Sequence, residues 1–137
     1  MRYLALDLGN RRIGLAVGGE EGVPVVPAGH IEKKTLRQDM ERVLAAVRDR
    51  GAGAIVVGMP YSLSGESGVQ AKLAEGFVKE LRKRTHLPVH TMDERFSSVE
   101  AEGLLRDSGA QPSRRRGDVD AMAAALILER FLALGQG

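Results

Sequence analysis

Acidic residues stand at three places in the sequence that call for a chemical explanation. Asp7 lies inside the apolar segment YLALDLG at 3–9, Glu94 follows the segment VHTM, and Asp120 precedes a run of small apolar residues. Strand interiors disfavour aspartate, and burying an unpaired carboxylate is costly. Carboxylates brought together repel one another unless cations or protons intervene, and hard oxygen ligands suit Mg²⁺ or Mn²⁺. Two such ions about 4 Å apart can activate water and stabilise the leaving oxygen of a phosphodiester.

The two acids at the start of the closing helix, expected at 118–134, have different orientations. At ~100° per residue, Asp118 falls on the side opposite Asp120. Asp118 is therefore expected to be a helix cap or a solvated residue, and Asp120 to project towards the sheet. The apolar residues that share the face of Asp120 are Ala124, Ile127, Leu128 and Phe131.

Each acid also has a purely structural interpretation. Asp7 could cap the turn at Asn10 and Arg11 or pair with an arginine, because an acid at a strand end often serves a turn. Glu94 taken alone is a surface loop acid, although open α/β sheets place their ligands at the carboxyl ends of strands. A lone inward carboxylate such as Asp120 can be a satisfied core residue, but three acids from three elements are harder to explain in that way.

The elements that must position these acids follow from the hydrophobic pattern. An antiparallel hairpin comes first, and strands then alternate with helices, which predicts an α/β fold with a mixed sheet. Leu36, Met40, Val43, Leu44 and Val47 share one face of the first helix. The expected strands are 3–9, 12–18, 23–31 (an edge strand, because of two prolines), 54–58 and 87–94; the helices are 35–51, 69–85, 97–109 and 118–134; and 59–68 and 110–117 are a loop and a polar linker.

Composition restricts the class of protein. A chain of 137 residues, 43% hydrophobic and 28% charged, predicts one globular domain over 1–137. No apolar run approaches the ~20 residues of a membrane span, and the start MRYLALDLG lacks the zones of a signal peptide. The absence of cysteine excludes disulfides and thiolate chemistry and is compatible with the cytoplasm.

Four motifs together resemble one known family. LALDLGNRRIGLAV, IVVGMPYSLSGESG, DERFSSVEAE and GDVDAMAAALIL occur in this order over roughly 3–132, and the combination is specific although each motif alone is modest. They are similar to the YqgF family, also called RuvX, whose members are described as Holliday junction resolvases and as pre-16S rRNA processing nucleases. The resemblance implies a ribonuclease H-like fold with a five-stranded mixed sheet flanked by helices.

The resemblance also implies a divalent-metal site with Mg²⁺ or Mn²⁺. By motif, its catalytic acids and metal ligands are Asp7, Glu94 and Asp120, in agreement with the argument from helix geometry. Asp118 occupies a position where members often carry a basic residue, so it could join the metal site or merely cap the helix.

Several residues around these motifs are candidates for contact with nucleic acid. Arg95 and Ser97, in the DERFSS motif, would lie beside the site, although Arg95 could instead pair with Asp93. The loop with Ser62 and Ser64 offers hydroxyls and backbone N–H groups to a phosphate backbone, or is a plain connector. The cationic run of Arg114, Arg115 and Arg116 either is solvated or binds phosphates.

The sequence therefore predicts a metal-dependent nuclease acting on branched DNA or precursor rRNA, with a homodimer required if both strands of a junction are cut symmetrically. A non-catalytic RNA-binding ribosome-assembly factor is the first alternative. A nucleotide-binding phosphotransferase is the second, because DLGNRRIG resembles the first phosphate loop of actin-like and sugar kinases. Those enzymes hold the nucleotide between two such domains, and this chain supplies one.

Overall fold

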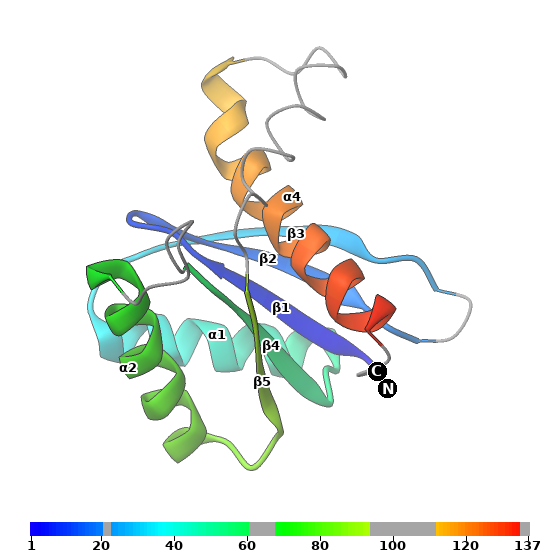
Figure 1. Ribbon diagram of the computed structural model, residues 1–137, viewed down its shortest axis with the longest axis horizontal. Helices are drawn as coiled ribbons and strands as arrows, with labels where there is room; N and C mark the ends of the chain where they lie inside the picture. The colour runs from blue at the N-terminus through cyan, green and yellow to red at the C-terminus, as the bar shows by residue number, and fades with distance from the viewer. Residues whose placement is uncertain (21–22, 61–67, 94–111, 135–137) are drawn as a thin grey trace.

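A computed structural model describes residues 1–20, 23–60, 68–93 and 112–134 of the chain. One five-stranded sheet forms its centre, with the strand order β3-β2-β1-β4-β5 (Figure 1). β1 is antiparallel to β2 and parallel to β4. The strands are β1 (Tyr3–Leu8), β2 (Arg12–Gly18), β3 (Val26–Glu32), β4 (Ala54–Met59) and β5 (Val89–Asp93), and the helices are α1 (Leu36–Arg50), α2 (Val69–Arg84) and α4 (Pro112–Ala133).

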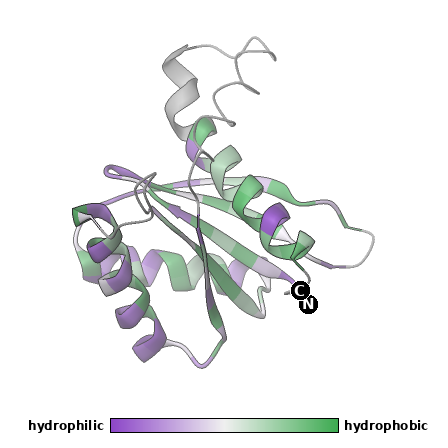
Figure 2. Cartoon of the chain, in the orientation of Figure 1, coloured by the Kyte–Doolittle hydropathy of each residue, from purple (hydrophilic) through white to green (hydrophobic). Residues whose placement is uncertain are grey.

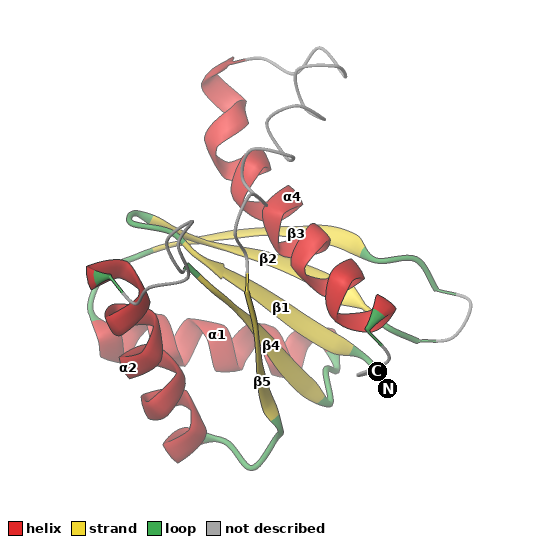
Figure 3. Ribbon diagram, in the orientation of Figure 1, coloured by secondary structure: helices red, strands yellow, loops and turns green. Residues whose placement is uncertain are grey.

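Helices cover both faces of the sheet, with α4 on one side and α1 and α2 on the other (Figure 3). Alternate residues of β1 supply the two cores. Leu4 and Leu6 pack in the cluster formed with α1 and α2, whereas Tyr3 and Ala5 pack in the cluster formed with α4. Hydrophobic residues accordingly follow the central strands, and hydrophilic residues gather on the outer sides of α1 and α2 (Figure 2). The predicted α/β fold with a mixed five-stranded sheet is confirmed.

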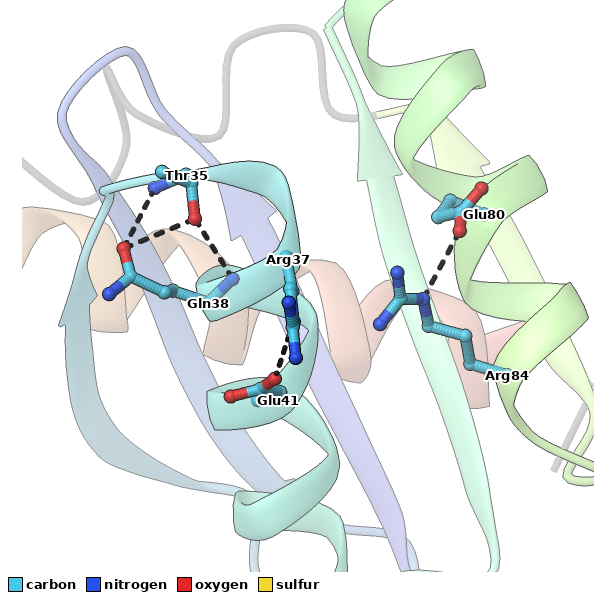
Figure 4. A network of polar contacts seen from close by, with 6 residues as sticks. All are labelled: Thr35, Arg37, Gln38, Glu41, Glu80 and Arg84. Atoms are coloured by element: carbon cyan, nitrogen blue, oxygen red, sulfur yellow. Dashed lines mark hydrogen bonds and ion pairs between the residues drawn. The ribbon is translucent and has the colours of Figure 1, made fainter.

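The first helix begins and ends at residues that stabilise its termini. The Thr35 hydroxyl accepts a hydrogen bond from the Gln38 N–H at 3.2 Å, and the Gln38 side chain accepts from the Thr35 N–H at 3.4 Å (Figure 4). This capping box satisfies N–H groups that the first turn leaves without helical partners. Gly51 ends the helix in the left-handed region at φ 65°. The expected range 35–51 therefore includes both caps.

The closing helix is longer than the hydrophobic pattern predicts. α4 begins at Pro112, so the expected linker at 110–117 is wrong from that residue onward. Proline suits the first position of a helix, where its missing N–H costs nothing, and arginine is a good helix former. Arg114, Arg115 and Arg116 thus belong to the helix. Asp118 lies in its second turn, so the interpretation of Asp118 as the N-cap is also wrong.

Leu36 differs from its expected environment. Met40, Val43 and Val47 are buried on the inner face of α1 as predicted, but Leu36 is 51% exposed. The helix begins at Leu36, and this side chain lines a pocket with residues of α2 instead of packing in the core.

Candidate active site

Asp7 occupies a place in the sheet where its neighbours have no side chains. It is 4% exposed and lies on the face of β1 that α4 covers, two residues from Ala5. Its partner across β2 is Gly14, and its partner across β4 is Gly58. Paired residues on adjacent strands point to the same side, so neither of these two partners places a side chain beside the carboxylate.

Gly14 also allows α4 to approach the sheet at this level. A Cβ at Gly14 would overlap the carbonyl oxygen of Asp120 and would lie 2.9 Å from the backbone nitrogen of Ala121. The buried residues Ala124, Ile127 and Leu128 hold the next turns of the helix against the sheet. The prediction that these residues share the inner face of α4 with Asp120 is confirmed by their burial.

The Asp120 carboxylate lies beside the end of β1. Its Oδ1 is 3.7 Å from the position that a Cβ of Gly9 would occupy. Burial raises the pKa of Asp120 from 3.8 to about 6, and the negative charge of Asp7 adds to the rise. Asp7 is therefore close enough to Asp120 to disfavour ionisation of the Asp120 carboxyl.

A charged cluster on β2 and β3 lies next to Asp120 and was not predicted from the sequence. Glu32 lies 3.2 Å from the Nε of Arg12 and 3.3 Å from the Nε2 of His30. Arg12 and His30 lower the pKa of Asp120, and Glu32 raises it. The available sequence signal was the spacing of His30 and Glu32, which places both on one face of a strand.

Other predicted site residues lie outside the described part of the chain. These are Glu94, Arg95, Ser97, Ser62 and Ser64. For Asp118 and for Arg114, Arg115 and Arg116, the structure gives the helical backbone only. Of the predicted catalytic acids, the structure brings together Asp7 and Asp120.

The sequence from residue 1 to residue 134 matches the family model described as RuvX, Holliday junction resolvase. The chain belongs to the RuvX family. Two relatives are named "Putative pre-16S rRNA nuclease". The one from Anaeromyxobacter sp. (strain Fw109-5) is 41% identical over 132 residues, which cover 96% of each chain. The one from Acaryochloris marina is 40% identical over 131 residues, which cover 94% of this chain and 90% of the relative. RuvX membership places the protein among enzymes that hydrolyse phosphodiesters.

Solved structures agree with the fold of this RuvX chain. Thermus thermophilus RuvC in complex with a Holliday junction substrate matches with a TM-score of 0.60 at 16% identity, covering 98% of this chain and 96% of that one. The fowlpox virus Holliday junction resolvase matches with a TM-score of 0.56 at 10% identity, covering 98% and 99%. At these identities the likeness concerns the fold, and it confirms the ribonuclease H-like architecture.

The donor set fits the divalent metal that a RuvX nuclease requires. Asp7 and Asp120 present hard carboxylate oxygens. Burial and, after it, the charge of Asp7 raise the pKa of Asp120, and a bound cation would offset both effects. Within the described ranges, no group of three or more histidine or acidic side chains is arranged to hold a metal ion. A third carboxylate would come from Glu94, which lies beyond those ranges.

The helices that the structure describes include none long and apolar enough to cross a membrane. α4 is the longest of them, with 22 residues, and it carries three consecutive arginines near its start.

Proposed function

We propose that this protein is a metal-dependent endonuclease that cuts structured nucleic acid at a site formed by Asp7, Glu94 and Asp120. The observation that supports this most directly is the juxtaposition of Asp7 with Asp120 over Gly14. A sheet carboxylate and a helix carboxylate in this arrangement offer hard oxygen ligands from two different elements. Mg²⁺ or Mn²⁺ bound there would supply Lewis acidity towards a phosphate and lower the pKa of a bound water.

The residues of the chain have distinct tasks in this proposal. Asp7 lies in the central strand and is only 4% exposed, so the atoms packed around it restrict the position of its carboxylate. Asp120 is half-buried and is positioned by the packing of α4. The guanidinium of Arg12 pairs with Glu32 and also lowers the pKa of Asp120, and in this proposal it attracts a phosphate to the same edge.

The nucleic-acid strand is proposed to pass over this edge and to contact residues from several elements. Arg95 and Ser97 follow β5 and Glu94 in the sequence, and Ser62 and Ser64 follow β4. The carboxyl ends of β4 and β5 lie at the same edge of the parallel part of the sheet. The arginines Arg114, Arg115 and Arg116 are proposed to bind phosphates from the first turns of α4. Asp118 is a second-choice ligand, because it lies two residues, about 200° of helical rotation, from Asp120.

Two substrates fit this chemistry. Precursor 16S rRNA is proposed first, because sequence relatives at about 40% identity carry that substrate in their names. Branched DNA is the second candidate, because it is the substrate in the family's description. A homodimer would be needed for symmetric cleavage of a junction, and a cytoplasmic location stays a prediction.

The test is a cleavage assay with the purified chain, a precursor 16S rRNA fragment and a four-way DNA junction. Each substrate is incubated with Mg²⁺, Mn²⁺ or EDTA. We expect metal-dependent cuts that disappear in Asp7→Asn, whereas Asp49→Asn, at an exposed position on α1, cuts like the wild type. Binding without cleavage in every condition would contradict the proposal and favour an RNA-binding assembly factor.

A further inference from the structure

A cleft of about 430 Å³ lies between the start of α1 and α2, on the sheet face opposite α4. Leu8 and Gly9, at the end of β1, line it, and Gly9 lies next to the Asp120 carboxylate. Its volume falls within the range of small-ligand sites, about 300–1,000 Å³. Figure 4 shows the beginning of α1 and the facing helix α2 in this region.

Two exposed leucines line this cleft on opposite helices. Leu36 of α1 is 51% exposed and Leu73 of α2 is 62% exposed, and the buried ring of Phe77 lies in the same wall. Scattered exposed leucines are ordinary, but two that line one cleft form an apolar surface that a ligand could cover.

Three lysines surround that apolar surface. Lys33, Lys34 and Lys72 all line the cleft and are exposed. Lys33 donates a hydrogen bond to the Gly9 carbonyl at 3.3 Å, which directs its ammonium group towards the end that adjoins the carboxylate site.

The acids of the cleft already have partners. The Asp39 carboxylate accepts a hydrogen bond from the Lys34 backbone N–H at 2.8 Å, and Glu80 pairs with Arg84 at 3.1 Å (Figure 4). With three lysines against two engaged carboxylates, the cleft favours an anion that also has an apolar body.

We propose that this cleft binds one nucleotide of the substrate strand. The base would lie against Leu36, Leu73 and Phe77, and its phosphates would lie near the ammonium groups of Lys33 and Lys72. A nucleotide combines a flat, largely apolar base with a negative phosphate, and it matches both parts of the lining. A base must be unpaired to enter, so the cleft selects a single-stranded segment, which precursor rRNA offers.

The location of Gly9 connects the cleft with the proposed cutting site. Gly9 lines the cleft, and the position of its missing Cβ lies 3.7 Å from the Asp120 Oδ1 on the other side of the chain. A strand held in the cleft therefore continues directly over the edge that bears Asp7 and Asp120. This inference rests on the proposed function only in that the ligand belongs to a nucleic-acid substrate.

Binding of a short single-stranded RNA, labelled with a fluorophore, tests the inference without cleavage. The full chain is titrated in EDTA, and fluorescence anisotropy is measured at several salt concentrations. Lys72→Glu is expected to weaken binding about tenfold and to reduce the slope of log affinity against log salt by about one or more. Leu73→Asn is expected to weaken binding several-fold with the salt slope unchanged, because it removes apolar contact and no charge.

Lys83→Glu is the matched control, since it makes the same charge change at an exposed position of α2 that does not line the cleft. Equal losses for Lys72→Glu and Lys83→Glu would overturn the inference and indicate a general electrostatic effect. Competition with uridine monophosphate distinguishes binding of a strand from binding of a free nucleotide. Cleft variants that weaken binding of uridine monophosphate but not of the RNA would overturn the assignment of the cleft to the strand. Unchanged RNA binding together with altered self-association in sedimentation would overturn it in favour of a protein interface.

These results can be separated from those of the cleavage assay. If Asp7→Asn abolishes cleavage while the cleft variants bind RNA normally, the nuclease proposal stands and the cleft inference fails. If the chain never cleaves but the cleft variants lose RNA binding, the cleft inference stands and the nuclease proposal fails.

Discussion

The backbone of Asp120 lies directly against Gly14, and no side chain separates the helix from the sheet at this point. The contact joins the element that carries one acid to the strand adjacent to the other acid, Asp7. The relative position of the two carboxylates therefore depends on a glycine that has no chemical role of its own.

Gly14→Ala is expected to displace α4 and destabilise the protein by roughly 1–3 kcal/mol, as for other overpacked sites. Urea denaturation measures the loss. Gly76→Ala is the control, because Gly76 lies within α2 and a Cβ there meets nothing within 4 Å. Alanine is the better helix former, so this variant should be more stable than the wild type by about 0.5–1 kcal/mol. Equal stability of the Gly14 variant and the wild type would show that α4 does not pack as described.

The stability of the metal-free protein should depend on the ionisation of Asp120. Its pKa rises from 3.8 to about 6 on folding, so the folded state binds more protons than the unfolded state between these values. The contribution of Asp120 to stability therefore falls as the pH rises through this window. Asp120→Asn removes the penalty and should stabilise the protein at pH 7 in EDTA by about 1–2 kcal/mol, after allowance for partial solvent screening.

Denaturation at several pH values checks this expectation. The gain from Asp120→Asn should shrink towards pH 4, where the wild-type carboxyl is protonated in the folded state. Asp49→Asn, on the exposed side of α1, should leave the pH profile unchanged. A gain that is the same at pH 4 and pH 7 would show that it has a cause other than ionisation.

Addition of Mg²⁺ or Mn²⁺ should raise the stability of the wild type and weaken its dependence on pH. An ion that binds only the folded state at 100 times its dissociation constant adds about 2.7 kcal/mol. Thermal unfolding across an ion titration measures the effect, and EDTA should reverse it. Asp7→Asn removes a proposed ligand and should abolish most of the increase. The same increase in stability for the wild type and for Asp7→Asn would show that the ion binds at a site that does not include Asp7.

Thr35→Ala is expected to cost about 1 kcal/mol of stability, because it removes the hydroxyl that caps α1. Arg37→Ala is a control from the same turn. Its ion pair with Glu41 is exposed, and its loss should change stability by less than about 0.5 kcal/mol. Urea denaturation of the two variants compares them directly, and equal losses would argue against the capping box as the source of the effect.

The sequence predicts the central strands and the inner face of α4 well because local periodicity determines both. Val56 and Val57 of β4 are buried on opposite faces, as a continuous apolar strand requires, and the spacing of Ala124, Ile127 and Phe131 identifies one side of a helix. These patterns need no knowledge of distant contacts.

Other features depend on contacts between distant segments, and local patterns do not reveal them. The first turns of α4 are polar and lack a hydrophobic period, so its start at Pro112 was missed. The role of the glycines at positions 14 and 58 cannot be predicted without the strand pairing that places both beside Asp7. The cluster of Arg12, His30 and Glu32 likewise requires the register of the outer strands.

Gly9 lines the proposed nucleotide cleft and lies beside Asp120 of the proposed cutting site, so it would set the distance between them as a molecular ruler does. The Gly9 N–H donates to the Arg12 carbonyl at 2.9 Å and closes the hairpin between β1 and β2. The distance between a base bound in the cleft and the phosphate that is cut would then be set by the geometry of this one tight turn. A chain built in this way would measure a constant distance along its substrate, whatever the sequence of the bases in between.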